Sequence, residues 1–538
     1  MPRVARSLLV RLAARPDAVG AAAVDRLGAI PTGAQAFEVP APLDRQPAIT
    51  IALDLAGTDR ATAVTITATG EIDIPFFGWF FRPLVRVAHR RYRAYAAATL
   101  RAALEGGPAP TAPRPVVGLP PVAFSPEQAT FIAAASAAAA IVAFTSALFG
   151  QLTSPISHSF GASDATIGVA FALTRLGALF ALFAIAIADR RGRRRSILVG
   201  VVGSAVVCGL SAVAPNLAWF TTAQVLQRGL VGTTATVAFL AVVEEAPEGA
   251  RAYAASMLAL AGGFGFSFSV ITLPFGDLAS WGWRIPFALG GATIFFAPAV
   301  ARRLGETARY TALAVHTSVV RGRARDVFER HRRRFVLLAV VAFLTSMFNG
   351  PSSSFMNKYL TDVRGFTNTD IAVFRAITTA IPGLVGVLVG GRLAEVRGRR
   401  PVAAIALAVA TGTQMIFFLT GGVSLWVMSG VSIFMAGAGG IALGTIDAEL
   451  FPTEVRSTSN AMLYVLGVLG SATGLVLAGA LSHHPSDLGR SVALTGIGSF
   501  LVALIIVPLL PESAARALDD VSPTQATADP GDEYGPGP

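Results

Sequence analysis

Three arginines interrupt long apolar segments of the sequence: Arg175, Arg228 and Arg375. An ionisable side chain within a membrane is costly, so such residues usually face the protein interior or a water-filled cavity and serve a function. A planar guanidinium group can hold a carboxylate through two parallel hydrogen bonds. No acidic residue lies at a comparable depth in these segments. We therefore expect a cationic central cavity that binds a small organic anion. The alternative for each arginine is pairing with backbone carbonyl groups or a helix end.

Uncharged polar side chains in the same segments are further candidates for substrate binding. The run Asn349-Gly350-Pro351-Ser352 is expected to break a helix, and a broken helix exposes carbonyl and hydroxyl groups to a substrate. Four glutamines also lie in apolar segments, at Gln151, Gln224, Gln227 and Gln414. The alternative role for these amides is hydrogen bonding between helices.

The composition is that of a chain that crosses a membrane many times. The 538 residues are 53% hydrophobic and only 14% charged, whereas a soluble domain carries about 25% charged residues. The mean hydropathy is +0.61. The single cysteine, Cys208, excludes an internal disulfide, and no Cys/His cluster has the spacing of a metal site. The sequence has no nucleophile elbow, phosphate-binding loop or dinucleotide fingerprint. We therefore expect neither an enzyme nor a bound metal or cofactor.

Segments of about 20 apolar residues are long enough to span a bilayer as helices. Helices are expected because the hydrocarbon core offers backbone polar groups no outside partner. Residues 401–446 carry no charged side chain and are long enough for two spans. Twelve spans are predicted, at residues 128–152, 165–188, 196–214, 217–243, 252–275, 285–301, 335–356, 371–392, 401–420, 424–446, 457–481 and 491–510.

Arginine is concentrated in alternate loops, which predicts the orientation of the chain in the membrane. The 43 Lys and Arg residues include a single lysine, Lys358, and the formal net charge is +11. The loops after spans 2, 6 and 8 are rich in arginine, whereas residues 152–164 and 420–424 have none. Because basic loops stay in the cytoplasm, we expect a plasma (inner) membrane protein with both termini cytoplasmic. The expected partners are the lipid bilayer and a small solute, with no nucleic acid, and the chain is expected to be a monomer.

The regions outside the spans define the domain organisation. Apolar alternation at 49–55 and 64–74, followed by a basic helix at about 83–105, predicts a small α+β extension on the cytoplasmic side. We place the aromatic run 76–81 in the core of this extension, with a membrane-surface location as the alternative. The predicted divisions are the extension 1–105, a Pro/Gly linker 106–124, a first six-helix half 125–304, a basic cytoplasmic central loop 305–334, a second half 335–511 and a disordered tail 512–538.

Two charged motifs recur after 205 or 206 residues, which indicates an internal duplication. The first motif, Asp/Glu-x-x-Gly-Arg-Arg, follows spans 2 and 8. The second motif, Glu-x-x-Pro-x-x-x-Arg, follows spans 4 and 10. Their functional positions are Asp189, Gly192, Arg193, Arg194, Glu244 and Arg251 in the first copy and Glu395, Gly398, Arg399, Arg400, Glu449 and Arg456 in the second. Two parallel six-helix repeats related by an axis along the membrane normal are typical of transporters.

The first motif, Asp189-Arg190-x-Gly192-Arg193-Arg194, resembles the signature loop of the major facilitator superfamily. The metabolite:proton symporter branch has a sequence similar to the run Trp281-Gly282-Trp283-Arg284-Ile285-Pro286-Phe287. The Glu-x-x-Pro-x-x-x-Arg loops are similar to those of the sugar-porter and metabolite-symporter branches. The resemblance covers about residues 125–512 and implies an all-α membrane fold of twelve helices in two parallel six-helix repeats. It also implies that the motif residues form a conformational latch between the halves. The alternative is ordinary charge at wetted helix ends.

One departure from the family pattern concerns coupling. Thr145 stands where family members often carry an aspartate, and no acidic residue lies in the middle third of any predicted span, so weak or absent proton coupling is expected. The leading hypothesis is a secondary active or facilitative transporter of a small organic anion, a carboxylate, that works by alternating access. The alternatives are a drug or lipophile exporter with an apolar cavity, and a ligand sensor or lipid-handling protein that uses the N-terminal extension.

Overall fold

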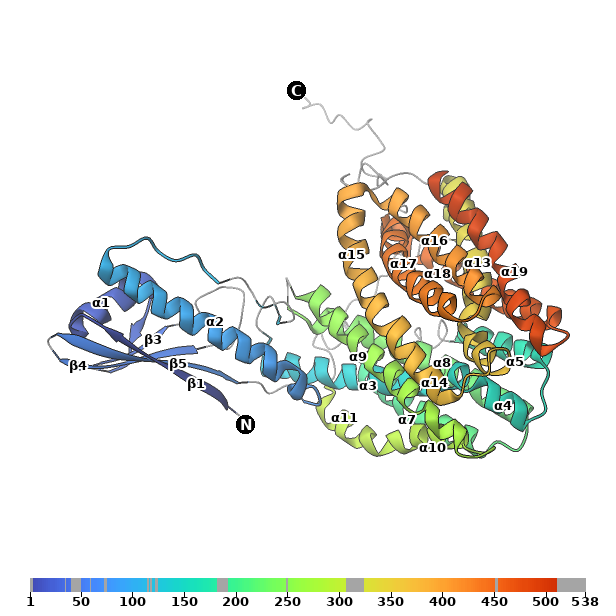
Figure 1. The fold of residues 1–538 in the computed structure, drawn as a ribbon, viewed down its shortest axis with the longest axis horizontal. Coiled ribbons are helices and arrows are strands. Elements are labelled where there is room, and N and C mark those ends of the chain that lie inside the picture. Colours follow the sequence, from blue (N-terminus) through green and yellow to red (C-terminus); the bar gives the residue numbers. More distant parts are fainter. Residues whose placement is uncertain are drawn as a thin grey trace, which may run out of the picture.

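The computed structural model describes residues 3–33, 35–39, 50–58, 60–71, 75–113, 116, 119–120, 124–180, 192–247, 250–305, 324–449 and 453–509. An N-terminal α+β domain projects from one end of a bundle of long helices (Figure 1).

The N-terminal domain is a five-stranded antiparallel sheet packed against two helices. The strands lie in the order β1-β5-β4-β3-β2, and their bounds are β1 Arg3–Leu12, β2 Ile30–Pro31, β3 Ala36–Val39, β4 Thr50–Thr58 and β5 Ala61–Glu71. Leu53 of β4 pairs with Ile66 of β5, and both side chains are fully buried. They pack with residues of α1 (Pro16–Leu27) and α2 (Gly78–Glu105). The alternation predicted for these two strands is therefore confirmed.

The aromatic run 76–81 lies at the start of α2, which begins five residues before the predicted helix. The placement of this run in the core of the small domain is wrong. Trp79 is 62% exposed, and the Trp79 and Phe80 rings lie 6.1 and 6.0 Å from the ring of Phe264 in the helical bundle. The first turns of α2 extend beyond the sheet toward the bundle (Figure 1), so they pack on the bundle instead.

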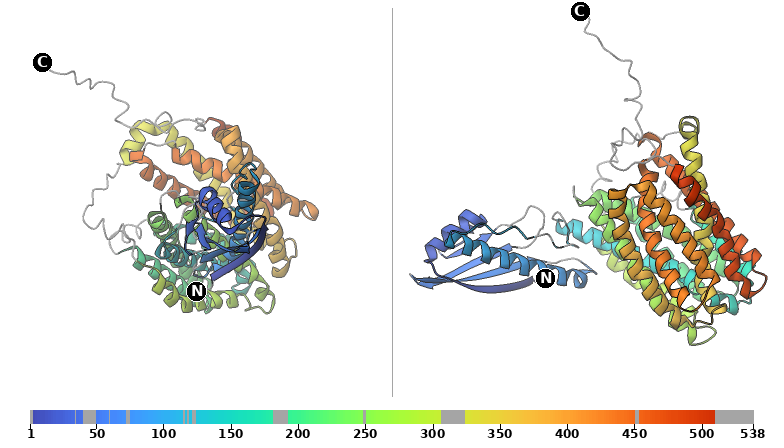
Figure 2. Two further views of the ribbon diagram at one scale, coloured as in Figure 1. Left: turned by 90° about the vertical axis from the view of Figure 1, so that its left-hand side faces the viewer. Right: turned by 45° about the horizontal axis from the view of Figure 1, so that its top comes forward.

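The bundle contains two groups of helices, one from each half of the sequence (Figure 2). The first half comprises α3 Pro126–Gln151, α4 Thr153–Ser159, α5 Asp164–Gly177, α7 Arg193–Ala212, α8 Leu217–Glu245, α9 Arg251–Ile271, α10 Arg284–Ala292 and α11 Ala297–Arg303. The second half comprises α13 Ala324–Asp362, α14 Asn368–Arg375, α15 Ile381–Arg397, α16 Arg399–Leu419, α17 Val423–Glu449, α18 Thr453–Leu481 and α19 Leu488–Leu501. Short 3-10 or π segments extend α9, α10, α14 and α19.

Eleven segments of the described chain are long and apolar enough to cross a membrane. They correspond to eleven of the twelve predicted spans. The second predicted span, 165–188, begins with α5, but residues 181–191 lie outside the described part of the chain. The predicted tail 512–538 lies wholly outside it.

Helix α13 corrects two predictions. It begins at Ala324, so the last part of the predicted central loop 305–334 is helical. It also continues through Pro351, so the expected helix break at Asn349-Gly350-Pro351-Ser352 is wrong. Proline removes one backbone donor and crowds the carbonyl four residues earlier, here that of Met347. Gly474 of α18 packs closely on that carbonyl, where a Cβ atom would lie only 1.8 Å from the oxygen. Helix α18 therefore packs closely on α13 at the turn that precedes Pro351.

The helical bundle has two ends, which are named here by their position relative to the N-terminal domain. We call the end of the bundle that faces the N-terminal domain (Figure 1) the proximal end. Gln128 at the start of α3 bonds there to the Glu245 carbonyl at the end of α8, and Arg193 at the start of α7 pairs with Glu244. Arg251, at the start of α9, lies at the same end, because Tyr253 contacts Phe124. The opposite end, with the connections near residues 160, 280, 365 and 485, is the distal end.

Candidate functional site

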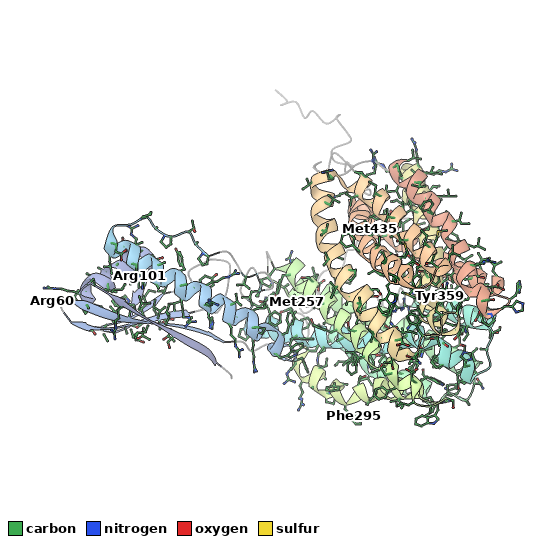
Figure 3. All side chains as sticks on the ribbon, in the orientation of Figure 1. Arg60, Arg101, Met257, Phe295, Tyr359 and Met435 are labelled. Carbon is green, nitrogen blue, oxygen red and sulfur yellow. The ribbon has the colours of Figure 1, made fainter. Side chains whose placement is uncertain are left out.

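Three neighbouring pockets lie in the bundle; the first two are lined by residues of both halves. The largest, of about 540 Å³, is lined by residues of α5, α8, α13 and α18. A second pocket of about 180 Å³ shares Arg175, Arg228 and Ser353 with it. The third, of about 380 Å³, is lined by second-half residues that include Met435, labelled in Figure 3. None of the described residues that line these three pockets is acidic.

The three predicted arginines all line these pockets. Arg175 and Arg228 line the largest and the second pocket, and Arg375 lines the second and the third. Arg175 and Arg228 are close enough for their charges to repel one another. The structure therefore brings together charges that the sequence separates, and it leaves them without an acidic partner among the described residues that line the pockets.

The arginines differ in how firmly they are held. The Arg175 guanidinium donates to the Ser354 hydroxyl at 3.2 Å, across the boundary between the halves. Arg228 forms no hydrogen bond or ion pair with any other described residue. Its charge is therefore available to a molecule in the cavity.

Arg375 is positioned by an amide network. Its Nε and one terminal nitrogen donate to Oδ1 of Asn357 at 3.0 and 2.7 Å. The Asn357 amide in turn donates to Oε1 of Gln151 at 2.7 Å, which joins α13 to α3. Arg375 is only 9% exposed, so a full positive charge is held in the interior by neutral partners. A buried charge with only neutral hydrogen-bond partners favours an anion nearby.

The predicted amides take different positions. Gln224 is satisfied, because it donates to the Ser211 hydroxyl at 2.9 Å. Both amide atoms of Gln227 are buried without a partner, and Gln227 lines the second pocket beside Arg228. Oε1 of Gln414 also lacks a partner and faces the third pocket. Asn349 is exposed to the largest and the third pocket.

Several cavity residues were missed at the level of sequence. They are Ser346, Ser353, Ser354, Asn357, Asn460 and Tyr464. A sequence pattern could have revealed three of them. Ser346, Ser353 and Asn357, together with the predicted Asn349, recur at intervals of three and four residues within an apolar span. That spacing places them on one face of a helix.

A cluster of charged groups joins the halves at the distal end, and the sequence analysis did not assign it a role. Lys358 of α13 is 5% exposed; its Nζ lies 3.2 Å from Oδ1 of Asp164 at the start of α5 and also contacts the carboxylate of Asp362. Nε2 of His158 lies 3.3 Å from Oδ1 of Asp362, and Ser482 donates to Asp164 at 2.7 Å. We call these five residues the distal cluster.

A second distal contact uses the start of a helix. Both carboxylate oxygens of Asp277, in the first half, accept hydrogen bonds from the backbone and side chains of Asn368 and Thr369 at 2.7–3.0 Å. These residues open α14, whose N-terminus favours a negative charge. The distal end is thus closed by two independent polar contacts between the halves.

The proximal motifs show the predicted duplication in their backbone. Gly192 and Gly398 precede α7 and α16 with φ, ψ values of 94°, 146° and 94°, 148°. This conformation suits glycine and is strained for other residues. Arg193 forms an ion pair with Glu244 within the first half. Arg194 donates to the Leu304 and Ala301 carbonyls at 2.7 and 3.0 Å, at the end of α11.

Only part of the predicted latch can be followed. Arg251 is exposed at the start of α9 and forms no ion pair with another described residue. Arg399 and Arg400 open α16. Asp189 lies outside the described residues, as do the side chains of Glu395, Glu449 and Arg456. The contact that is seen, Arg193 with Glu244, joins helices of one half.

A bundle of membrane-spanning helices in two halves, with a polar cavity between them, defines a membrane transporter. The model of the Major Facilitator Superfamily matches residues 130–446. The chain belongs to this superfamily, and it is a multi-pass membrane transporter rather than an enzyme.

Relatives and solved structures agree with this assignment. The alpha-ketoglutarate permease of Escherichia coli (strain K12) is 26% identical over 351 residues, covering 60% of this chain and 78% of that protein. The citrate-proton symporter of Klebsiella pneumoniae is 26% identical over 377 residues, covering 63% and 82%. The crystal structure of a bacterial homologue of the human lysosomal transporter Spinster, inward-facing and unoccupied, has a TM-score of 0.60 at 18% identity and covers 72% and 98%.

Proposed function

We propose that this transporter carries a small organic anion with more than one carboxylate. The observation that carries the proposal is the pair Arg175 and Arg228, which line the central cavity without an acidic partner among its described lining residues. Arg375 supplies a second positive centre at the edge of the same space. Two cationic centres suit two carboxylates of one molecule. The substrates named for the two relatives, alpha-ketoglutarate and citrate, have this chemistry.

The polar lining disfavours a drug or lipophile exporter. Such a protein needs an apolar cavity, whereas this one presents guanidinium, amide and hydroxyl groups from both halves. Binding of an anion relieves the repulsion between Arg175 and Arg228 and supplies an acceptor to Gln227, whose amide nitrogen has no partner. These gains exist only when the cavity is occupied.

The transport cycle that we propose follows from the closed distal end. The largest pocket extends from the middle of α13, at Ala342, to Asn460, which lies toward the proximal end of α18. Arginine-rich loops at the proximal end favour a cytoplasmic location for that end, with both termini inside and the protein in the plasma membrane. The state would then be open to the cytoplasm. In the opposite state the twelve motif residues would latch the proximal ends together.

Substitution of Arg228 tests the proposal. In proteoliposomes, counterflow of radiolabelled citrate and alpha-ketoglutarate should fall at least about 30-fold in Arg228→Ala, because loss of a buried charged partner costs about 2–5 kcal/mol. Arg228→Lys should recover little activity, since lysine lacks the planar fork. Arg195→Ala, an exposed proximal arginine, is the matched control and should transport normally. Full carboxylate transport by Arg228→Ala would contradict the proposal.

A further inference from the structure

A separate apolar pocket lies where the N-terminal domain meets the first half. Its volume is about 70 Å³, smaller than each of the three central pockets, so it has room for part of a chain-like apolar molecule. Three phenylalanines at the start of α2, Phe124 before α3, and residues of α3 and α9 form its wall. Met257, labelled at this junction in Figure 3, is one of them. No described residue of the second half lines it, and it shares no lining residue with the central pockets, so it is distinct from the transport cavity.

The depth of this pocket matches one leaflet of a bilayer. Its lining on α3 runs from Ala129 to Ser136, and α3 begins at Pro126. At 1.5 Å per residue, Ser136 lies about 15 Å from that end, which is half of a hydrocarbon core of about 30 Å. On α9, Leu260 and Phe264 are partly exposed, and apolar side chains exposed on a membrane-spanning helix face the lipid. The pocket therefore lies in the proximal leaflet and is open to it.

The surroundings of the pocket are basic. Arg82 follows the lining residue Phe81, Arg251 lies two residues before the lining residue Tyr253, and both are exposed. Arg303 lies over the ring of Phe76 at 5.2 Å. The described acidic residues at this end are Glu127, which is exposed, and Glu244 and Glu245 at the end of α8, where Glu244 pairs with Arg193. Exposed Trp79 beside these arginines is the combination typical of a membrane interface.

We propose that this pocket binds part of an acyl chain of an anionic phospholipid from the proximal leaflet, with the headgroup phosphate held by Arg82 and Arg251. The apolar wall accepts the chain at leaflet depth, and the arginines at the interface favour a negative headgroup. The lipid fills the joint between α2, α3 and α9. It thus ties the N-terminal domain to the first half, so that both move together during transport.

The test measures lipid retained by the full chain. The protein is reconstituted in nanodiscs with equimolar phosphatidylglycerol and phosphatidylcholine, extracted into detergent and analysed by native mass spectrometry. Wild type should retain one phosphatidylglycerol in preference to phosphatidylcholine. Met257→Trp, which fills the pocket, should retain neither, and Leu260→Trp provides a second filling variant if the first does not fold. Phe295→Trp, at an exposed site away from the pocket, should behave as wild type.

The headgroup assignment has its own variants. Arg82→Ala with Arg251→Ala should lower the preference for phosphatidylglycerol about tenfold. Arg101→Ala with Arg60→Ala, in the part of the N-terminal domain remote from the pocket (Figure 3), should leave it unchanged. Unchanged lipid retention in a folded pocket-filling variant would overturn the proposal. Retention of detergent alone, or equal retention of both lipids by wild type, would overturn it as well.

Discussion

At the scale of single residues, the most informative side chain in the cavity is Gln227. It is 1% exposed, yet neither its amide nitrogen nor its amide oxygen has a partner. Leaving a buried polar group unsatisfied costs about 1–3 kcal/mol. The neighbouring Arg228 also forms no hydrogen bond or ion pair with another described residue. Two adjacent residues with unmet hydrogen-bonding capacity, both lining the same pocket, are best explained by a ligand that satisfies them.

Replacement of Gln227 should therefore separate binding from stability. Gln227→Leu should keep or raise the melting temperature in detergent, because it removes an unsatisfied amide, while the apparent affinity for substrate falls about tenfold, the effect of about 1.4 kcal/mol. Thermal unfolding and concentration-dependent uptake measure the two effects. Gln224→Leu is the matched control: it breaks a satisfied bond to Ser211, so it should lose stability and change affinity little. An unchanged affinity in Gln227→Leu would rule out the contact.

At the scale of elements, glycine sets how closely paired helices approach. In the first half, a Cβ atom on Gly265 of α9 would lie 2.0 Å from the carbonyl oxygen of Ala140 on α3. In the second half, Gly470 of α18 has the same relation to Phe343 of α13, at 2.2 Å. Small residues allow membrane helices to pack backbone to backbone. The two contacts occupy equivalent helix pairs, so the duplication seen in the charged motifs extends to the packing.

This packing predicts a contrast between two glycines on one helix. Gly265→Ala should destabilise the protein by about 1–3 kcal/mol, because the added methyl group forces α9 away from α3. Gly263→Ala should be neutral or slightly stabilising, since nothing lies within 4 Å of a Cβ atom there and alanine favours helix. Melting temperatures in detergent compare the two. Equal stability of the two variants would show that α3 and α9 are not held by this contact.

At the scale of the whole molecule, the distal cluster connects two bodies that must separate during transport. Lys358 sits between two carboxylates from different halves, and all three side chains are nearly buried. Removing one partner of a buried ion pair costs about 3–5 kcal/mol, because the remaining charge is uncompensated. Without Lys358, Asp164 and Asp362 would repel each other in the closed state, so the balance should shift toward a state that is open at the distal end.

Cysteine labelling can measure this shift. Lys358→Ala should raise the rate at which an impermeant thiol reagent, added from the distal side, labels Gly150→Cys in the second pocket by at least about tenfold. The native Cys208 is buried and does not interfere. Arg364→Ala is the matched control at the same end, because among the described residues Arg364 bonds within its own half, to Tyr359 at 2.8 Å. Equal labelling of Lys358→Ala and wild type would contradict a role in closing the distal end.

Coupling is also a property of the whole molecule. Because no described residue lining the central pockets is acidic, a pH gradient alone should not drive accumulation of radiolabelled carboxylate in proteoliposomes, although counterflow should proceed. Accumulation would show that another group carries the proton. Asp164→Asn and Asp362→Asn would then reveal whether the carrier is the distal cluster, in which His158 also contacts Asp362.

The features that depend on a local pattern of residues could be predicted from the sequence. Hydropathy marked the spans, the arginines within them marked the cavity, and the recurring motifs around Gly192 and Gly398 marked the duplication and the superfamily. Each of these features depends on residues that are close together in the sequence. Strands β4 and β5 of the N-terminal domain were also predictable, because their alternation has a period of two residues, whereas β1, β2 and β3 were not predicted.

Which side chains meet across long sequence separations is known only from the folded structure. The amide of Asn357 bonds to Gln151 across 206 residues, and Ser482 bonds to Asp164 across 318. The distal cluster, the unmet capacity of Gln227 and Arg228, and the docking of the 76–81 aromatic run on α9 all depend on how the halves and the N-terminal domain pack. The local sequence does not predict which distant residues come into contact, because burial and pairing depend on the surface against which each segment packs after folding.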